Sequence, residues 1–370
     1  MKISPFKLER YFAKYEFNTQ YLLSSSDCDG FNMQEILGMA TSKETELWNN
    51  LQLGYTESQG FPMLRDEITK MYSKITPDQV MVLTPEEGIF IALNCILCKE
   101  DHVICISPSY QSLHQIVESI GCDITYWQPN EEKGWYFDPS DIEKSIRPNT
   151  RLIIINFPHN PTGYLPSLDD FQKVIDIAKE NNLLIFSDEM YRYLEHDSVN
   201  RLPSASDLYC NAISLSGLSK TFGLAGLRIG WITTQNSALL NEMIAYKDYT
   251  TICCSAPSEI LGFIALRHKE NLIDINLKKI KINLNLLDEF IKNHSHSLSW
   301  IKPNAGTIGL AKLKINMPSL DFCEKVVKDT GVMIVPSEMF YYGTSHIRLG
   351  FGRANLPEVL KVLDSYELLQ

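Results

Sequence analysis

The sequence predicts an α/β fold, in which a mostly parallel sheet carries helices on both faces and a smaller α+β domain follows. Short apolar runs rich in β-branched residues recur along the chain, and helical stretches separate them. That alternation is typical of strand–helix–strand units with parallel strands. Polar side chains able to bind a ligand come directly after several of these runs, where open α/β sheets place their ligands. A chain of 370 residues has room for about two to three domains.

The composition is that of an ordinary globular protein, with 44% hydrophobic and 21% charged residues. A formal net charge of -11 disfavours binding to nucleic acid or to an anionic membrane, so we expect neither partner. No apolar run is long enough to span a membrane, and the first residues lack the apolar core of a secretory signal.

The nine cysteines are odd in number and scattered, which favours reduced thiols and a cytoplasmic location. Cys95 and Cys98 fall in an apolar helical stretch, and no second pair completes a zinc pattern. We expect both to be reduced core residues, with a redox pair as the alternative.

Two segments of the N-terminal part hold residues of possible functional interest. Pro5–Tyr15 is amphipathic and aromatic, and Asp27 and Asp29 follow three serines further along. Both aspartates are expected as turn and helix-capping residues. Tyr55 lies in a glycine-containing loop before an amphipathic helix, a position where a tyrosine alone is more often a packing residue than a ligand.

The first predicted strand, Val80–Leu83, leads through the turn Thr84–Gly88 into a helix over residues 89–98. A strand, a tight turn and a helix N-terminus together present free backbone N–H groups to an anion. The next strand, Val103–Ile106, is followed by Tyr110, which could cap the strand end or contact a ligand.

Two further strands end in polar residues. Leu152–Phe157 runs into an Asn-Pro-Thr-Gly turn that contains Asn160, and His159 beside it is expected to be structural. Asp188 ends the next apolar run, and Tyr191 follows three residues later. An aspartate after a strand is by itself also a common helix N-cap.

Lys220 lies among small and apolar residues in Ser214–Trp231, and Arg228 follows in the same segment. Burial makes such a lysine easy to deprotonate, and a neutral amine forms Schiff bases with carbonyls, including pyridoxal phosphate. A cofactor phosphate would need a guanidinium and short hydroxyls, which Arg228 and the serines of this segment, Ser214, Ser216 and Ser219, could supply. The alternative is a glycine-rich turn with a solvated lysine.

The segment S-K-T-F-G-L-A-G-L-R-I-G-W resembles the lysine segment of class I/II aminotransferases, which are fold-type I pyridoxal-phosphate enzymes. The similarity covers roughly Phe31–Tyr366. It implies a seven-stranded, mostly parallel sheet and three parts of the chain. These are an N-terminal segment (1–45) at the active-site mouth, a large cofactor-binding domain (46–240), and a linking helix with a small domain (241–370).

The resemblance also implies roles for individual residues. Lys220 would hold the cofactor as a Schiff base, Asp188 would face its pyridine nitrogen, and Tyr110 would stack on its ring. Asn160 and Tyr191 would contact the phenolic oxygen. Ser219, Arg228 and the Pro85–Gly88 turn would hold the phosphate together with Tyr55 of a neighbouring subunit, which implies a homodimer with shared active sites.

Two features of the sequence bear on charge in that site. Glu86 and Glu87 stand where the family usually has small residues, so we expect the backbone amides to hold the phosphate and at least one glutamate to face elsewhere. Arg348, in a strand near the end, would bind the substrate α-carboxylate. Arg353 is expected in a surface or interface pair.

We therefore predict a pyridoxal-phosphate-dependent aminotransferase that moves an amino group between an amino acid and a 2-oxo acid. A lyase or cyclase that uses the same cofactor is one alternative, and a non-catalytic sensor with this fold is another. No basic helix-turn-helix precedes the fold, which argues against the sensor. Because Asp27, Asp29 and Glu57 lie on segments that flank the pocket in the family, we further hypothesise a substrate with a cationic side chain.

Overall fold

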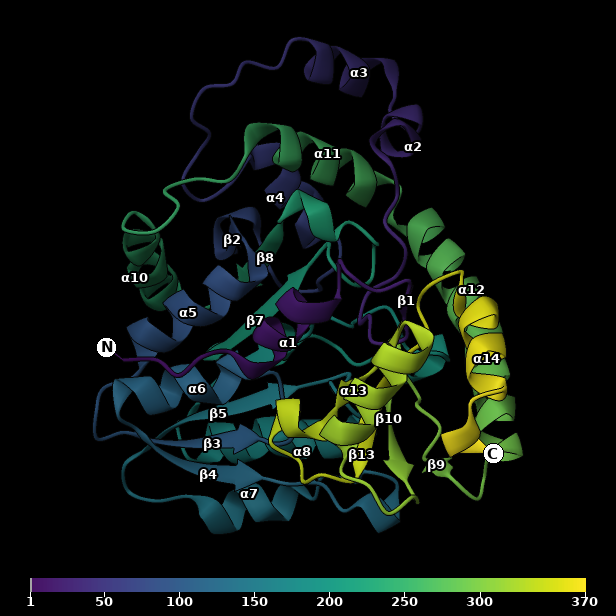
Figure 1. The fold of residues 1–370 in the computed structure, drawn as a ribbon. Helices are drawn as coiled ribbons and strands as arrows, with labels where there is room; N and C mark the ends of the chain where they lie inside the picture. Colours follow the sequence, from purple (N-terminus) through teal and green to yellow (C-terminus); the bar gives the residue numbers. More distant parts are fainter. Residues whose placement is uncertain (1) are drawn as a thin grey trace.

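The computed structural model describes residues 2–370 and confirms the predicted α/β fold class. A seven-stranded sheet with strand order β2-β8-β7-β6-β5-β3-β4 forms its centre (Figure 1). The strands are β2 Val80–Leu83, β3 His102–Ile106, β4 Asp123–Trp127, β5 Thr150–Asn156, β6 Leu184–Asp188, β7 Ala212–Gly217 and β8 Gly230–Thr233. β8 runs antiparallel to both of its neighbours, and the other pairings are parallel.

Helices cover both faces of this sheet, which explains why its strands are apolar at successive positions. In β3, Val103 and Cys105 point into one core, whereas Ile104 and Ile106 point into the other. The first core is closed by α5 Pro85–Ile96, α6 Ser112–Ile120 and α10 Ser237–Lys247. The second is closed by α7 Pro139–Ser145, α8 Leu168–Glu180 and α9 Ala205–Leu208.

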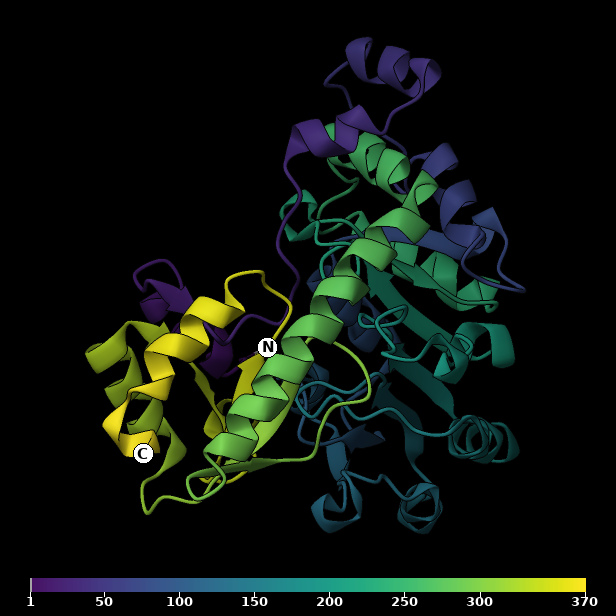
Figure 2. The same cartoon turned by 90° about the vertical axis from the view of Figure 1, so that its right-hand side faces the viewer.

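A smaller antiparallel sheet of strand order β12-β13-β10-β9 lies beside the large one. Its strands are β9 Leu298–Trp300, β10 Ile308–Leu313, β12 Val335–Pro336 and β13 His346–Gly350. The helices α13 Ser319–Thr330 and α14 Leu356–Asp364 pack with it, and the long helix α12 Lys269–Asn293 connects the two sheets (Figure 2). This is the predicted smaller α+β part.

Two connections lead from the large sheet towards the small one. After β8, the helices α10 and α11 Ala256–Arg267 are separated by an irregular segment over 248–255. Before β10, Ala305 forms an isolated bridge to Glu195.

The N-terminal residues cross from the large sheet to the small one. Helix α1 Lys7–Tyr15 packs on the small part, and β1 Tyr21–Leu22 pairs with β11 Val332–Met333. The chain then lies so close to β13 that a Cβ on Gly350 would approach the Ser25 carbonyl oxygen to 2.1 Å. The glycine is therefore needed for a close backbone approach.

The remaining helices lie around α11. They are α2 Met33–Gly38, α3 Ser42–Asn49 and α4 Pro62–Thr69, and α2 and α3 lie beyond α11 at the top of the molecule (Figure 1). Short 3-10 turns occupy Pro77–Gln79, Glu131–Lys133, Ser198–Asn200, Ala225–Leu227, Ser337–Phe340 and Glu367–Leu369. Within residues 2–370, no helix combines the length and the apolar character that a membrane crossing needs.

Candidate active site

A cavity of about 580 Å³ lies at the carboxyl ends of the parallel strands, between the large sheet, α1 and the small part. It brings together nine of the eleven predicted site residues. These are Glu86, Tyr110, Asn160, Asp188, Tyr191, Ser219, Lys220, Arg228 and Arg348. Glu87 and Tyr55 are not among the residues that line it. The convergence follows from topology, because parallel strands end at one edge of a sheet.

Lys220 follows β7 and extends its amine into this cavity. The Nζ donates a hydrogen bond to the Ser26 hydroxyl at 2.8 Å. Burial lowers the pKa of the amine, while the Asp27 carboxylate raises it and the Arg348 guanidinium lowers it further. The amine is therefore easier to deprotonate than an ordinary lysine, as a nucleophile requires.

Asp188 is the last residue of β6 and is 6% exposed. Its carboxylate accepts a hydrogen bond from the Met190 N–H at 3.1 Å, and no ion pair engages it within residues 2–370. Burial raises the pKa of this carboxyl to about 7. A buried carboxyl without a cationic partner fits a site that receives a protonated ring nitrogen.

Asn160, Tyr191 and Tyr110 lie around the same cavity. The Asn160 side-chain oxygen accepts from Arg348 at 3.2 Å. The Tyr191 hydroxyl donates to the Ser26 carbonyl at 2.8 Å, and the Tyr110 hydroxyl donates to Glu9 at 3.0 Å. The contacts that these three residues would make with the cofactor ring remain predictions. The Tyr191 hydroxyl already donates its hydrogen to a protein carbonyl.

One end of the cavity is suited to an anion. The buried Ser219 hydroxyl has no hydrogen-bond partner, and Arg228 lies exposed at the rim. At the start of α5, the Glu86 backbone N–H donates no hydrogen bond within residues 2–370, whereas the Glu87 N–H is capped by the Thr84 side chain. Free N–H groups at a helix N-terminus and an unpartnered hydroxyl are the donors that a phosphate needs.

The two glutamates of this turn point in different directions. Glu87 accepts hydrogen bonds from Thr251, whose hydroxyl lies at 2.7 Å, and from Thr250, so it faces away from the cavity. Glu86 lines the cavity and accepts a hydrogen bond from the Ser112 hydroxyl. Burial raises the pKa of Glu86, which reduces its repulsion of a nearby anion.

Ser214 does not belong to the site, contrary to the expectation that serines of its segment all serve the phosphate. It lies inside β7, and its hydroxyl donates to the buried carboxylate of Glu189 at 2.7 Å. Ser216 is also a buried strand residue and does not line the cavity. Only Ser219, past the end of the strand, reaches it.

Arg348 is the charged group at the opposite side of the cavity. It is 1% exposed and donates to Asn160 and to the Ser24 carbonyl, the latter at 2.9 Å. Its Nε has no hydrogen-bond partner, and no carboxylate pairs with it within residues 2–370. Such a buried guanidinium needs an anion. Arg353 instead pairs with Asp27 at 3.1 Å, as an arginine in a structural pair would.

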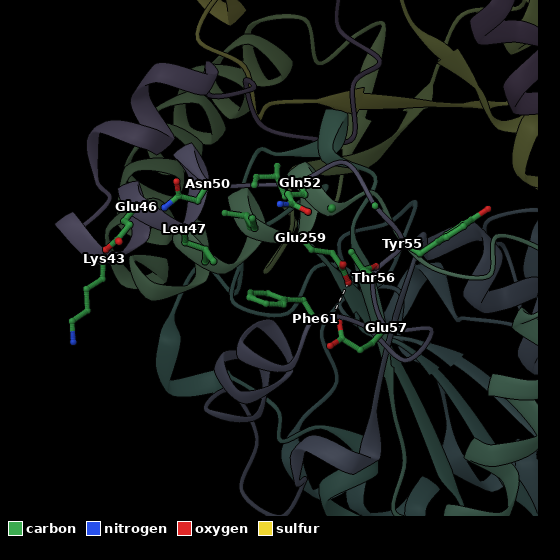
Figure 3. Close-up of a pocket in the computed structure, with 14 residues that line it drawn as sticks. Lys43, Glu46, Leu47, Asn50, Gln52, Tyr55, Thr56, Glu57, Phe61 and Glu259 are labelled. Atoms are coloured by element: carbon green, nitrogen blue, oxygen red, sulfur yellow. Dashed lines mark hydrogen bonds between the residues drawn. The ribbon is translucent and has the colours of Figure 1, made fainter.

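Tyr55 lies on the outer side of the molecule. Its side chain is 90% exposed, and the residue lines an outer pocket together with Leu47, Phe61 and Glu259 (Figure 3). Glu57 lines this outer pocket rather than the cavity at Lys220. Within one chain, neither residue reaches the candidate active site.

Several cavity residues were missed by the sequence analysis. Glu9, Phe12 and Glu16 come from α1, and Ser25 and Ser26 come from the crossing segment. The resemblance placed residues 1–45 at the active-site mouth without singling these residues out, and the amphipathic character of residues 5–15 indicates a helix but not the surface that it meets. Asn156 at the end of β5 was also missed, and its amide donates to the Asp188 carbonyl at 3.0 Å.

The residues present fit pyridoxal phosphate. The cavity offers a deprotonatable amine at Lys220, a buried carboxyl at Asp188 without a cation, and unpartnered donors at Ser219 and the α5 N-terminus. The cofactor's aldehyde could bond to Lys220, its ring nitrogen could face Asp188, and its phosphate could accept from the unpartnered donors.

Known proteins resemble this chain in sequence and in fold. A family model described as aminotransferase class I and II matches residues 18–363. Capreomycidine synthase of Streptomyces vinaceus is 26% identical over 277 residues, which are 74% of this chain and 70% of that protein. Aspartate aminotransferase of Sulfolobus acidocaldarius is 26% identical over 315 residues, 80% of this chain and 78% of that protein.

A solved structure extends the likeness to the whole chain. The crystal structure of a PLP-dependent aminotransferase from Streptococcus suis has a TM-score of 0.91 at 27% identity, and the match covers 99% of both chains. The family model spans nearly all of the sequence, and the cavity offers the groups that this cofactor requires. The chain therefore belongs to the class I and II aminotransferases, fold-type I enzymes whose cofactor is pyridoxal 5'-phosphate.

Proposed function

We propose that this chain is an aminotransferase that moves an amino group from an amino acid to a 2-oxo acid. One observation carries the proposal. A single cavity holds the amine of Lys220, the unpaired carboxyl of Asp188 and the unpaired guanidinium of Arg348. An amine that can carry protons and an arginine that can hold a carboxylate are the groups that transfer of an α-amino group requires.

The roles of the chain's own residues follow from their positions. When bound, the cofactor supplies an electron sink for the bonding electrons of the substrate α-carbon. Asp188 would remain ionised against the cofactor's ring nitrogen and keep that nitrogen protonated. Asn160 and Tyr191 would contact the phenolic oxygen, and Tyr110 would pack on the ring. Ser219, Arg228 and the α5 N-terminus would hold the phosphate.

Two residues would handle the substrate. Arg348 would bind the α-carboxylate with its free Nε edge and so fix the direction of the α-hydrogen. Lys220 would hold the cofactor before a substrate binds, and its Nζ would then accept the substrate α-proton and later donate it back. Its lowered pKa supports this use, because a neutral amine is the form that accepts a proton.

We also propose a homodimer in which Tyr55 serves the neighbouring subunit. The tyrosine is almost fully exposed and does not line the cavity of its own chain, so it is free to reach a neighbouring subunit. Tyr249 is 92% exposed and Leu53 is 84% exposed, and a partner subunit would cover these side chains. Mixed dimers of Tyr55→Ala and Lys220→Ala chains test this. Activity restored by mixing two poorly active parents would support shared sites, and no recovery in a proven mixed dimer would contradict them.

The reaction itself is tested with an amino acid labelled with ¹⁵N at the α-position and with 2-oxoglutarate. Appearance of ¹⁵N in glutamate, with an unlabelled side chain left intact on the resulting oxo acid, supports transamination. Turnover of the amino acid without nitrogen transfer would overturn it.

A lyase or cyclase acting on an amino acid is the second candidate. One relative, at 26% identity, is named capreomycidine synthase rather than an aminotransferase, and this supports the second candidate. The cavity residues described here would serve both reactions, because both begin with removal of the α-proton. Loss of a side-chain group or ring closure in the labelled product would favour this candidate over transamination.

A further inference from the structure

One wall of the active-site cavity is a helix face that none of the roles above employs. Glu9, Phe12 and Glu16 lie three and four residues apart on α1 and at its C-cap, so they share one face of the helix. All three line the cavity together with Phe6. Two carboxylates separated by an aromatic ring therefore face the space in which a substrate side chain would extend.

Neither carboxylate is neutralised by the protein. Glu9 accepts one hydrogen bond, from the Tyr110 hydroxyl, and forms no ion pair within residues 2–370. The Glu16 carboxylate has no hydrogen-bond partner among the described residues. Burial and then the nearby Asp27 carboxylate raise the pKa of Glu16, an unfavourable situation that a bound cation would relieve.

The other charges of the cavity are already committed. Asp27 is paired with Arg353, Glu86 accepts from Ser112, and Asp188 would face the cofactor. Of the cations that line the cavity, Lys220 would hold the cofactor. Arg228 would meet the phosphate and Arg348 the α-carboxylate. Glu9 and Glu16 therefore remain as negative charges without a counterion.

A second, independent observation also points to a ligand. Ser25 is 6% exposed, lines the same cavity, and its hydroxyl has no hydrogen-bond partner. The neighbouring carbonyl of Ser24 is held by Arg348. An unpaired buried hydroxyl in the wall of the cavity is available to a polar group of a bound molecule.

We propose that Glu9 and Glu16 form a subsite for the positive end of the substrate side chain, an ammonium or a guanidinium, with Phe12 packing against its methylene groups. The inference rests on the proposed function, because the substrate is taken to be anchored by its α-carboxylate at Arg348. A long side chain with apolar methylenes and a terminal cation matches an aromatic ring flanked by carboxylates.

This subsite replaces the residues first hypothesised for a cationic substrate. Asp27 is paired with Arg353, and Asp29 is paired with Lys279 at 2.6 Å. Glu57 lines the outer pocket. The negative charge that the sequence analysis expected beside the substrate side chain therefore lies on a different segment, α1.

The test uses a ligand pair that cannot react. 5-Guanidinopentanoate has arginine's carboxylate and guanidinium but no α-amino group, and 5-ureidopentanoate is its neutral counterpart. Calorimetric titration of the cofactor-loaded enzyme measures the affinity of each. We expect the guanidino compound to bind about 10- to 100-fold more tightly, because charge-assisted hydrogen bonds are stronger than neutral ones. Equal affinities would overturn the subsite.

Isosteric variants then locate the effect. Glu9→Gln and Glu16→Gln keep shape and hydrogen bonding but remove charge, so the affinity ratio should fall towards one in the double variant. Glu143→Gln, exposed on α7, is the matched control and should leave the ratio unchanged. A ratio that survives the double variant would place the recognition elsewhere and overturn the assignment.

Turnover separates this inference from the proposed function. With arginine and citrulline as substrates, the two variants should raise KM for arginine and change kcat little. If nitrogen transfer fails for every amino acid while the affinity ratio holds, the subsite stands and the aminotransferase reaction fails. If transfer occurs with neutral or acidic amino acids and the ratio is one, the reaction stands and the subsite fails.

Discussion

Two regions build the candidate active site in different ways. The cofactor region lies at the ends of neighbouring strands, where Asn156 and Asp188 are paired residues of β5 and β6. The substrate region consists of α1 and the irregular N-terminal segment that follows it and lies against β13. There, Arg348 donates a hydrogen bond to the Ser24 carbonyl, 324 residues away in the sequence. The first is fixed by one sheet, and the second depends on packing between distant parts. The cofactor groups should therefore tolerate changes in the N-terminal segment better than substrate recognition does.

The largest effect is expected from the cofactor region. Lys220→Ala removes both the amine that holds the cofactor and the group that moves the α-proton. We expect turnover to fall on the order of 10³- to 10⁴-fold and the visible absorption band of the cofactor-loaded protein to be lost. Lys43→Ala, an exposed lysine, is the control. Retention of the band in Lys220→Ala would contradict the assignment.

The next effect concerns Asp188 in the cofactor-free protein. Its folded pKa of about 7 lies above the ordinary value of 3.8, so its protonated form stabilises the fold. That contribution is complete below about pH 4 and is lost progressively between about pH 4 and pH 7, by on the order of 4 kcal/mol.

Urea denaturation at pH 5 and pH 8 measures this loss. The wild type without cofactor should lose more stability between these values than Asp188→Asn, and added cofactor should reduce the difference. Equal pH dependence of the two proteins would show that the carboxyl is already ionised in the fold.

A smaller effect is expected where the two regions meet. Arg348→Lys keeps the charge but loses the planar fork, so kcat/KM should fall about 10- to 100-fold, mainly through KM. The cofactor band should be unchanged. Arg353→Lys, in the partly exposed pair with Asp27, should lower kcat/KM far less. Similar losses in both variants would mean that the fork at Arg348 is not used for substrate.

The smallest effect is expected from the close approach of the substrate region to β13. In Gly350→Ala the new Cβ would clash with the Ser25 carbonyl, and we expect a loss of about 1–2 kcal/mol in unfolding free energy. Gly38→Ala has open space around it and serves as control. If KM rises while the cofactor band is unchanged, the two regions are separable as proposed. A lost band would show that they are coupled.

The difference between the regions also explains what the sequence could predict. Strands, their order of appearance and the residues after them are local patterns, so Asn160, Asp188 and Lys220 could be placed in one cavity beforehand. Ser214 was assigned wrongly because it lies within β7, and strand residues face the cores rather than the sheet's edge. Glu9 and Glu16 could not be found, because only the packing of α1 on the small part directs them to the cavity.

The long reach of the N-terminal segment has a consequence for how the protein is made. Ser24 leaves the ribosome early, yet the strand that holds it contains Arg348, synthesised 324 residues later. At about 5–20 residues per second, the segment waits roughly 15–65 seconds for its partner. The large sheet can assemble during this interval, whereas the substrate side of the pocket cannot. A nascent chain should thus acquire the means to hold its cofactor before it can discriminate between amino acids.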